Sequence, residues 1–289
     1  MQLEKTFFQK EVRFGYEVSE KVKKIWAVEL NLLEYFDNLC REHNLRYFIE
    51  YGTLLGAVRH QGFIPWDDDI DVVMFRDDYE KLKIVARDAV CPPYFFQDAY
   101  TDSMVGAFSK LRDSRTTAIE FPDALPDYNQ GIFIDIFPLD HVSDGVNMDL
   151  TIGEIQREIW MSIVNPQAFV SMIEQGHKPV LDTSLYMELL RMPVRERIRT
   201  FEEFNISQFG KSGKVQFITD FLWGHPGLPQ EWYSEVIYLP FENLMAPVPA
   251  EYDKILKHRF GDYMTPVQGK SDHEGIFWDP DVPYTKYMK

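Results

Sequence analysis

The sequence predicts an α+β protein with a mixed-sheet core over residues 1–140 and a largely helical portion over residues 141–289. Up to Pro138, segments with helical spacing of apolar residues alternate with short runs typical of strands, and beyond it long helical patterns dominate. Hydrophobic residues make up 45% of the chain and charged residues 26%, which is the balance of a globular protein rather than a disordered one. The patterns leave open whether the two portions form one compact unit.

The first predicted elements lead to an acidic segment. Apolar residues recur at three- and four-residue steps from Glu20 to Asn44, which predicts a helix with one buried face. The aromatic run Arg46 to Tyr51 predicts a short strand. Gly52 and Thr53 then turn the chain into a predicted short helix, Leu54 to His60. A further strand is predicted from Asp69 to Phe75, with its apolar end buried.

The later elements are predicted in the same way. Asp77 or Asp78 would cap a helix that runs to Val90, and residues 94–119 should be rich in strands, with a turn near Asp113. Gly131 to Phe137 reads as an apolar strand that a single acid, Asp135, interrupts. The helical patterns that follow break near Pro166, residues 176–179 and residues 210–213, and a last helix is predicted at Pro249 to Phe260.

Charge and cysteine content narrow the class of function. The net charge is −16 and no basic run compensates it, so binding to nucleic acid is disfavoured, whereas a small anion could still bind through divalent metal ions. Two cysteines, Cys40 and Cys91, are too few for a disulfide framework or a structural zinc site. The first 18 residues lack the apolar core of a signal peptide, and no window approaches the length of a membrane span. We therefore expect a cytoplasmic protein.

Four aspartates lie within five positions of the segment IPWDDDIDVVMF. In a strand, Asp69 and Asp71 point to the same face, and Asp67 joins them if the extended backbone begins early. Carboxylates this close repel one another, so a positive species should lie between them. Hard oxygen ligands on a rigid strand suit Mg²⁺ or Mn²⁺, and two such ions could clamp a phosphoryl transfer. The alternative is a solvated acidic turn or cap.

Other residues strengthen the metal interpretation. Backbone N–H groups at Gly52 and Thr53 could cradle a phosphate, although a glycine after a strand is usually only a turn. Asp135 in its apolar strand is either a third metal ligand or general base, or half of a buried salt bridge. Cations that could meet an anion are Arg59, His60, Lys110, Arg112 and Arg115, of which Lys110 is the strongest candidate.

Aromatic residues flank the acids, and they allow two interpretations. Trp66, Phe63, Tyr51 and Tyr47 could belong to the core, which is the commoner fate of aromatic side chains, or could hold a cationic head group. His273, within HEGIFWD, could be a site residue contributed from the C-terminal segment, although a lone histidine is more often structural.

Three blocks carry a resemblance to a known family: YGTLLGAVRHQGFIPWDDDIDVVMFRDDYEKL (Tyr51 to Leu82), KLRDSRTT (Lys110 to Thr117) and GIFIDIFPLD (Gly131 to Asp140). With weaker echoes in FENLMAPVPAEYDKIL, FGDYM and PYTKY, they resemble the LicD family of the nucleotidyltransferase superfamily. Residues 141–235 carry no recognised motif. One departure from the compact superfamily pattern is the 15-residue gap between Thr53 and Asp69, which leaves the placement of the glycine turn on the donor open.

The resemblance implies a nucleotidyltransferase-like fold and transfer of phosphocholine from CDP-choline to a cell-surface glycan. Asp67, Asp69 and Asp71 would match the metal-binding acids, Asp135 the third carboxylate, and Gly52–Thr53 the turn beside the phosphate. The expected reaction is attack of an acceptor hydroxyl on the choline-bearing phosphorus, with Asp135 as base, CMP as leaving group, and Mg²⁺ or Mn²⁺ as cofactor. Arg59, His60, Trp66, Lys110 and Arg112 are the expected substrate contacts.

Three other functions remain open at this stage. A cytidylyltransferase would use the same acids, a glycosyltransferase could use a DxD site, and an inert module could bind a glycan or a nucleotide. The helical portion, residues 141–289, is expected to complete the core and to shape the acceptor site. If the acceptor glycan is lipid-linked, the enzyme would work at the inner face of the membrane without a membrane span.

Overall fold

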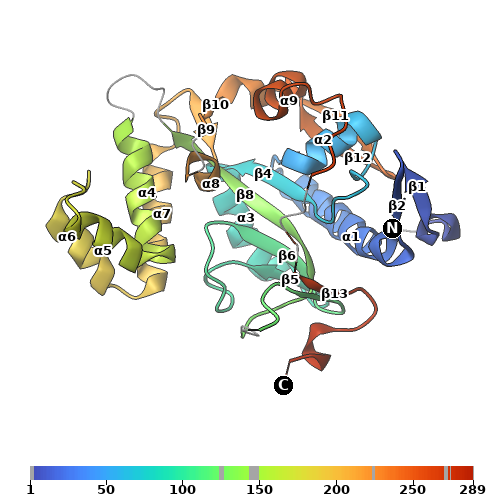
Figure 1. The fold of residues 1–289 in the computed structure, drawn as a ribbon, viewed down its shortest axis with the longest axis horizontal. Coiled ribbons are helices and arrows are strands. Elements are labelled where there is room, and N and C mark those ends of the chain that lie inside the picture. The colour runs from blue at the N-terminus through green and yellow to red at the C-terminus, as the bar shows by residue number, and fades with distance from the viewer. Residues whose placement is uncertain are drawn as a thin grey trace. The chain divides into compact units, whose positions relative to one another are not determined.

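The computed structural model describes residues 3–123, 127–142, 150–222, 225–269, 273 and 275–288. Helices and strands mix along the chain, which confirms the α+β class (Figure 1). Contacts divide the chain into two compact units. The first unit holds residues 1–74, 78–137 and 232–289, and the second holds residues 75–77 and 138–231. The predicted domain division at residue 140 and the nucleotidyltransferase-like topology stay predictions.

A sheet runs through the first unit, and its strands carry the candidate site. Strand β8 (Ile132–Val142) is hydrogen-bonded to both β4 (Asp71–Phe75) and β6 (Ser109–Asp113). Beyond them, β3 (Phe48–Ile49) pairs antiparallel with β4, and β5 (Tyr94–Gln97) pairs antiparallel with β6. The register of β6 and β8 places Lys110 opposite Asp135. The prediction of a strand-rich stretch with a turn near Asp113 is therefore confirmed.

Helix α1 (Glu20–Glu42) packs on this unit as its apolar spacing predicts. Ser19 caps it by accepting a hydrogen bond from the Val22 N–H at 3.2 Å. Ile25 forms a buried cluster with Ala118, Ile132 and Phe133. This packing fixes one face of α1 beside the start of β8.

Helix α2 (Tyr51–His60) begins earlier than predicted. Tyr51 has φ of 50°, so the chain reverses at this residue, and Gly52 and Thr53 lie in the first helical turn instead of before it. The predicted strand from Arg46 to Tyr51 is accordingly reduced to β3. Gly52 and Thr53 are thus held by helical geometry.

The acidic strand begins later than predicted. Strand β4 starts at Asp71, so Asp67 and Asp69 precede it. The Asp67 N–H donates to the Ile64 carbonyl at 2.9 Å, and the Trp26 Nε1–H donates to the Asp67 carbonyl at 3.0 Å. Turn and side-chain hydrogen bonds therefore occupy the backbone there in place of a strand ladder.

Two predicted helix starts and one strand end are wrong. Helix α3 (Arg76–Ala89) follows β4 directly, so Asp77 and Asp78 lie inside it; the Asp78 carboxylate accepts from the Arg46 N–H at 3.3 Å instead. Strand β8 continues to Val142, past the predicted end at Phe137. The last helix, α9 (Tyr252–Phe260), starts after Pro249 because residues 244–249 form strand β12.

Short antiparallel strand pairs complete the first unit. These are β1 (Glu11–Arg13) with β2 (Tyr16–Val18), β11 (Val236–Phe241) with β12 (Leu244–Pro249), and β7 (Thr117–Ile119) with β13 (Phe277–Asp279). The short helix η1 (Lys5–Phe8) precedes β1, η2 (Gln230–Tyr233) precedes β11, and η3 (Tyr284–Lys286) follows β13. Pairing of β13 with β7 forms a separate two-stranded sheet, which ties the C-terminal segment to the first unit.

The second unit is mainly helical, as predicted for this part of the chain. It contains α4 (Leu150–Val164), α5 (Pro166–Glu174), α6 (Thr183–Arg191), α7 (Val194–Gln208), β9 (Lys214–Gln216), α8 (Ile218–Leu222) and β10 (Leu228–Pro229). A buried ion pair lies within it: Arg76 Nε is 2.6 Å from Asp140 Oδ1, and Asn205 donates to Asp140 Oδ2 at 3.0 Å. Because β9 to β12 lie between residues 214 and 249, the C-terminal portion is less helical than predicted.

Among the described residues, no helix combines the length and the apolar character that a membrane crossing requires.

Candidate active site

The predicted metal-binding acids come together at the edge where β4 begins. The Asp135 N–H donates to the Ile70 carbonyl at 2.9 Å, which ties the acid of β8 to the residue before Asp71. Burial raises the pKa of Asp71 well above its usual value, and the charges of Asp69, Asp135 and Asp67 raise it further. Asp67, Asp69, Asp71 and Asp135 thus form one electrostatic cluster, as the sequence predicts.

The cluster carries an excess of negative charge. Burial raises the pKa of Asp67 well above its usual value, with repulsion from Asp69 as the next cause. Burial also raises the pKa of Asp69, although the charge of His273 opposes this rise. Raised pKa values mean that the protein does not fully stabilise the ionised carboxylates. Added positive charge at this site would stabilise the ionised carboxylates.

Gly52 and Thr53 support the acidic segment directly. A Cβ atom on Gly52 would lie 2.5 Å from Asp67 Oδ2, a distance that real Cβ atoms do not reach, so only glycine allows this approach. Thr53 is buried, and its Oγ1 accepts a hydrogen bond from the Asp71 N–H at 2.8 Å. Both residues therefore position aspartates, and their predicted contact with a phosphate stays a prediction.

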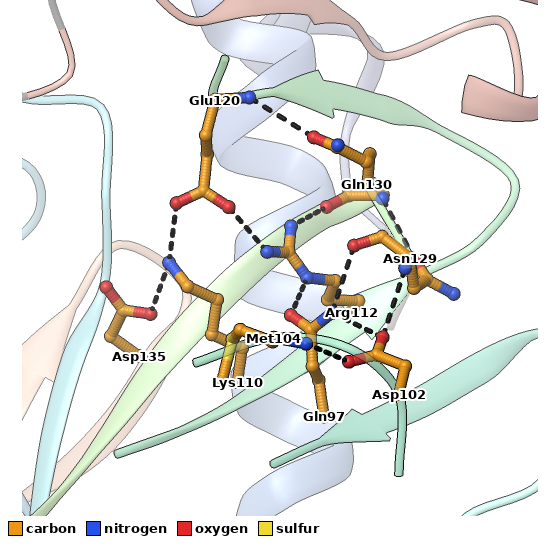
Figure 2. Close-up of polar contacts among 10 residues, drawn as sticks. Gln97, Asp102, Met104, Lys110, Arg112, Glu120, Asn129, Gln130 and Asp135 are labelled. Carbon is orange, nitrogen blue, oxygen red and sulfur yellow. Dashed lines mark hydrogen bonds and ion pairs between the residues drawn. The ribbon is translucent and has the colours of Figure 1, made fainter. Parts of the chain in front are cut away.

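Lys110 lies between two carboxylates (Figure 2). Its Nζ is 3.0 Å from Asp135 Oδ1 and 3.2 Å from Glu120 Oε1, and it lies 3.4 Å from the centre of the Phe133 ring. Burial opposes ionisation of Glu120, but the charges of Lys110 and Arg112 outweigh it and lower its pKa to about 2. Both interpretations of Asp135 thus have support: it pairs with a buried cation and also belongs to the acid cluster.

Arg112 is fully buried and bonded within the protein. Its guanidinium donates to Gln97 at 2.5 Å, to the Gly131 carbonyl at 2.8 Å and to Glu120 at 2.6 Å (Figure 2). This arrangement fixes the carboxylate of Glu120 beside Lys110. The geometry favours a positioning role over the predicted substrate contact. Arg115, the third cation of this stretch, instead pairs with Asp113 at 2.6 Å.

Arg59, His60 and Trp66 form a separate group. Arg59 Nε donates to His60 Nε2 at 2.9 Å, and Arg59 Nη1 donates to the Tyr263 carbonyl at 2.7 Å. Burial, then the positive charges of Arg59 and Arg13, lower the pKa of His60 to about 4, so its ring is neutral at pH 7. The Trp66 ring packs edge-on to that of His60, with centroids 6.3 Å apart. Only Trp66 is next in sequence to an acid of the cluster.

The flanking aromatic residues divide between the two interpretations. Phe63 stacks on Trp26 with centroids 4.5 Å apart, and the buried Tyr47 donates its hydroxyl to Asp37, so both belong to the core. Tyr51 and Trp66 are only half-buried.

His273 lies beside the acids, although the sequence favoured a structural role. Its Nδ1 is 3.2 Å from Asp68 Oδ1 and 3.8 Å from Asp69 Oδ2, and one ligand atom from each of these three residues lies within 4.8 Å of the others. Burial opposes its protonation, but a hydrogen bond to Asp68 and the charges of Asp69, Asp68 and Asp135 raise its pKa to about 9. His273 is therefore a cation at neutral pH that partly offsets the cluster.

The arrangement fits a hard divalent cation. The acids offer carboxylate oxygens, which Mg²⁺ and Mn²⁺ prefer, and their pKa values are raised first by burial and then by mutual repulsion, so an ion bound there would stabilise the ionised carboxylates. Asp67, Asp69, Asp71 and Asp135 stay the predicted ligands; among the described residues, the acids and histidine whose ligand atoms lie within 4.8 Å of one another are Asp68, Asp69 and His273.

Comparison with protein families assigns residues 44–173 to the description "LicD/FKTN/FKRP, nucleotidyltransferase domain". Over 241 residues the chain is 30% identical to lipopolysaccharide cholinephosphotransferase LicD of Haemophilus influenzae, covering 81% of this chain and 88% of that protein. The chain belongs to the LicD family. The human ribitol 5-phosphate transferase FKRP is 31% identical over 104 residues, which cover 35% of this chain and 20% of that protein.

The family domain contains most of the site. Its span includes Gly52, all the clustered aspartates, Lys110 and Glu120, but it ends long before His273. Both named relatives transfer a phosphate-bearing alcohol group, which supports an enzyme for this LicD-family chain.

Proposed function

We propose that this LicD-family protein transfers phosphocholine, or a similar alcohol phosphate, from a CDP-activated donor to a hydroxyl of a cell-surface glycan precursor. The observation that carries the proposal is the placement of Asp135 beside Asp71, with Lys110 bonded to Asp135 at 3.0 Å. Acids suited to bind a divalent cation and the acid proposed to accept a proton lie together there. Similarity to a cholinephosphotransferase over most of the chain supports the same reaction.

In this proposal, different residues bind the metal ion, accept the proton and position the base. Asp67, Asp69, Asp71 and Asp135 would hold Mg²⁺ or Mn²⁺, which would supply charge neutralisation for the donor pyrophosphate. Asp135 accepts the proton of the acceptor hydroxyl, whose oxygen bonds to phosphorus as the bond to CMP breaks. Lys110 orients Asp135 and adds positive charge on the side of Phe133.

Three neighbouring aromatic rings are suited to bind the choline head group of the donor. Phe137 lies two residues after Asp135 on β8, and its ring is 5.8 Å from that of Tyr51 and 4.9 Å from that of Phe108. All three rings are half-buried, so they are shielded without being part of the core. Two of these rings already face a cation, with Arg259 Cζ 4.4 Å from the centre of the Tyr51 ring and Lys110 Nζ 5.3 Å from that of Phe108. This aromatic group is therefore suited to cation–π contacts, and we propose that it favours choline over an uncharged alcohol.

The competing functions differ in what they release. A cytidylyltransferase would form pyrophosphate, whereas the proposed transferase forms CMP, and an inert module forms neither. The module is disfavoured because all four predicted acids are present and clustered.

A direct test incubates the protein with CDP-choline, Mg²⁺ and a glycan acceptor, and measures CMP. The double variant Asp69→Ala, Asp71→Ala is assayed in parallel as the control. Metal-dependent CMP release by the wild type and its loss in the variant is the expected result. Unchanged turnover in the variant would reject the site, and no turnover in either protein would favour the binding module.

The cellular setting follows from the same proposal. We propose that the protein acts in the cytoplasm, and at the inner membrane face where its acceptor is lipid-linked. Residues 141–235 are proposed to shape the acceptor site.

A further inference from the structure

Glu29 is a buried acid without a visible partner. It lies in the middle of α1, its side chain has no solvent exposure, and neither carboxylate oxygen has a hydrogen-bond partner among the residues that the structure describes. Burial of a carboxyl group without a hydrogen bond is costly, and an apolar residue at this position would avoid that cost. Packing of the helix alone therefore gives no reason for a glutamate.

The helix face that carries Glu29 is turned toward the acidic segment. Trp26 lies one turn earlier on the same face, and its Nε1–H donates to the Asp67 carbonyl at 3.0 Å. The pKa of Glu29 is raised well above its usual value, first by burial and then by the charges of Asp69, Asp68, Asp67 and Asp71. Glu29 thus approaches the same cluster from the α1 side.

The cations brought to this cluster have bonds to other acids. Lys110 pairs with Asp135 and Glu120, and His273 pairs with Asp68. On α1 itself, Lys23 lies over the Trp26 ring and pairs with Glu11. A positive charge that would stabilise ionised Glu29 is therefore best supplied by an ion bound among the acids that Glu29 faces.

We propose that Glu29 is a further carboxylate of the divalent-cation site, contacting the bound ion from the α1 side either directly or through one water. The inference rests on the metal site of the proposed function and adds a residue outside the matched family domain, which begins at residue 44. A bound ion would then connect α1 to the segment that precedes β4. Removal of the carboxylate should weaken ion binding without harming the ion-free protein.

The test is a titration of the full-length protein with Mn²⁺ alone, followed by the electron paramagnetic resonance signal of free Mn²⁺. We compare the wild type with Glu29→Gln, which keeps the shape of the side chain. Loss of a supporting ligand weakens metal affinity by roughly 10–100-fold, and we expect a Kd increase in that range. The control is Glu42→Gln at the exposed end of the same helix, which should leave the Kd unchanged.

Thermal unfolding without metal separates binding from folding. Glu29→Gln should melt at or above the wild-type temperature, and Mn²⁺ should stabilise it less than it stabilises the wild type. If Glu29→Gln does not fold, Glu29→Met, which fills the space without polar atoms, takes its place. Failure of both variants to fold would show that Glu29 serves the fold alone and would overturn the inference.

The remaining outcomes are also decisive. Wild-type affinity for Mn²⁺ in a folded Glu29 variant would reject Glu29 as a ligand while leaving the proposed function intact. Absence of Mn²⁺ binding in the wild type would reject the metal site itself, and with it this inference.

Discussion

Glu120 gives a prediction whose size follows from the structure. Its carboxylate bonds to Lys110 at 3.2 Å and to Arg112 at 2.6 Å, and its pKa falls from 4.5 to about 2. A folded-state pKa below the unfolded value adds stability above pH 4.5, and that stability is lost as the pH falls toward 2. A difference of about 2.5 units at 1.36 kcal/mol each corresponds to about 3.4 kcal/mol at pH 7.

The substitution Glu120→Gln removes this charge with little change in shape. We expect the free energy of unfolding to fall by about 2–4 kcal/mol at pH 7, because Lys110 and Arg112 lose their shared anion. At pH 3 the same linkage leaves Glu120 a stabilising contribution of only about 1.4 kcal/mol. The difference in the free energy of unfolding between wild type and variant should therefore be about 2 kcal/mol smaller at pH 3 than at pH 7. Urea denaturation at both pH values measures this.

A matched control separates this effect from a general effect of removing a charge. Glu251 pairs with Lys254 at 2.9 Å, but both side chains are about half exposed, so Glu251→Gln should change stability by less than about 1 kcal/mol. Equal destabilisation by Glu120→Gln at pH 7 and at pH 3 would refute the electrostatic reasoning.

Three further substitutions test the site. Gly52→Ala should weaken Mn²⁺ binding at least about tenfold, because the new Cβ would displace Asp67. The control is Gly269→Ala, whose added Cβ would have no atom within 4 Å. Equal Mn²⁺ affinity in the two variants would contradict the close approach of Gly52 to Asp67. Asp71→Asn should lower the rate of CMP release roughly 10²–10³-fold. Since its raised pKa means that ionised Asp71 costs stability at pH 7, the ion-free variant should also melt higher, and a lower melting temperature would count against this. Phe137→Leu should raise the KM for CDP-choline by about 5–30-fold and that for CDP-glycerol less; an equal effect on both would argue against a cation site.

The acid cluster was predictable because its residues are close in sequence. Four aspartates within five positions must repel one another wherever they fold, and Asp135 stands out in an apolar strand. The sequence also predicts the order of the surrounding helices and strands. It misplaces the start of α2, because the reversal at Tyr51 depends on a left-handed backbone conformation that nothing in the residue type indicates.

The residues whose place in the site the sequence could not establish depend on tertiary contacts. His273 reaches Asp68 across 205 positions, through pairing of β13 with β7. Nothing in the sequence singles out Glu120, because its role depends on Lys110 and Arg112, which β6 places beside it. Of these residues, Glu29 is the one that the sequence pattern marks as unusual, because it is an acid within the apolar face of the first predicted helix, one turn after Trp26.

The balance of charge in the site links ion binding to donor binding. The described cluster brings the acids Glu29, Asp67, Asp68, Asp69, Asp71 and Asp135 into mutual repulsion, and Lys110 and His273 are the cations that act on it. A donor pyrophosphate adds more negative charge, so its approach becomes favourable only when divalent ions enter with it. By linkage, the donor must then strengthen ion binding by the same factor by which the ions strengthen donor binding. In the proposed function, the repulsion that destabilises the ion-free protein would therefore be the property that makes the site select a metal-bound anion.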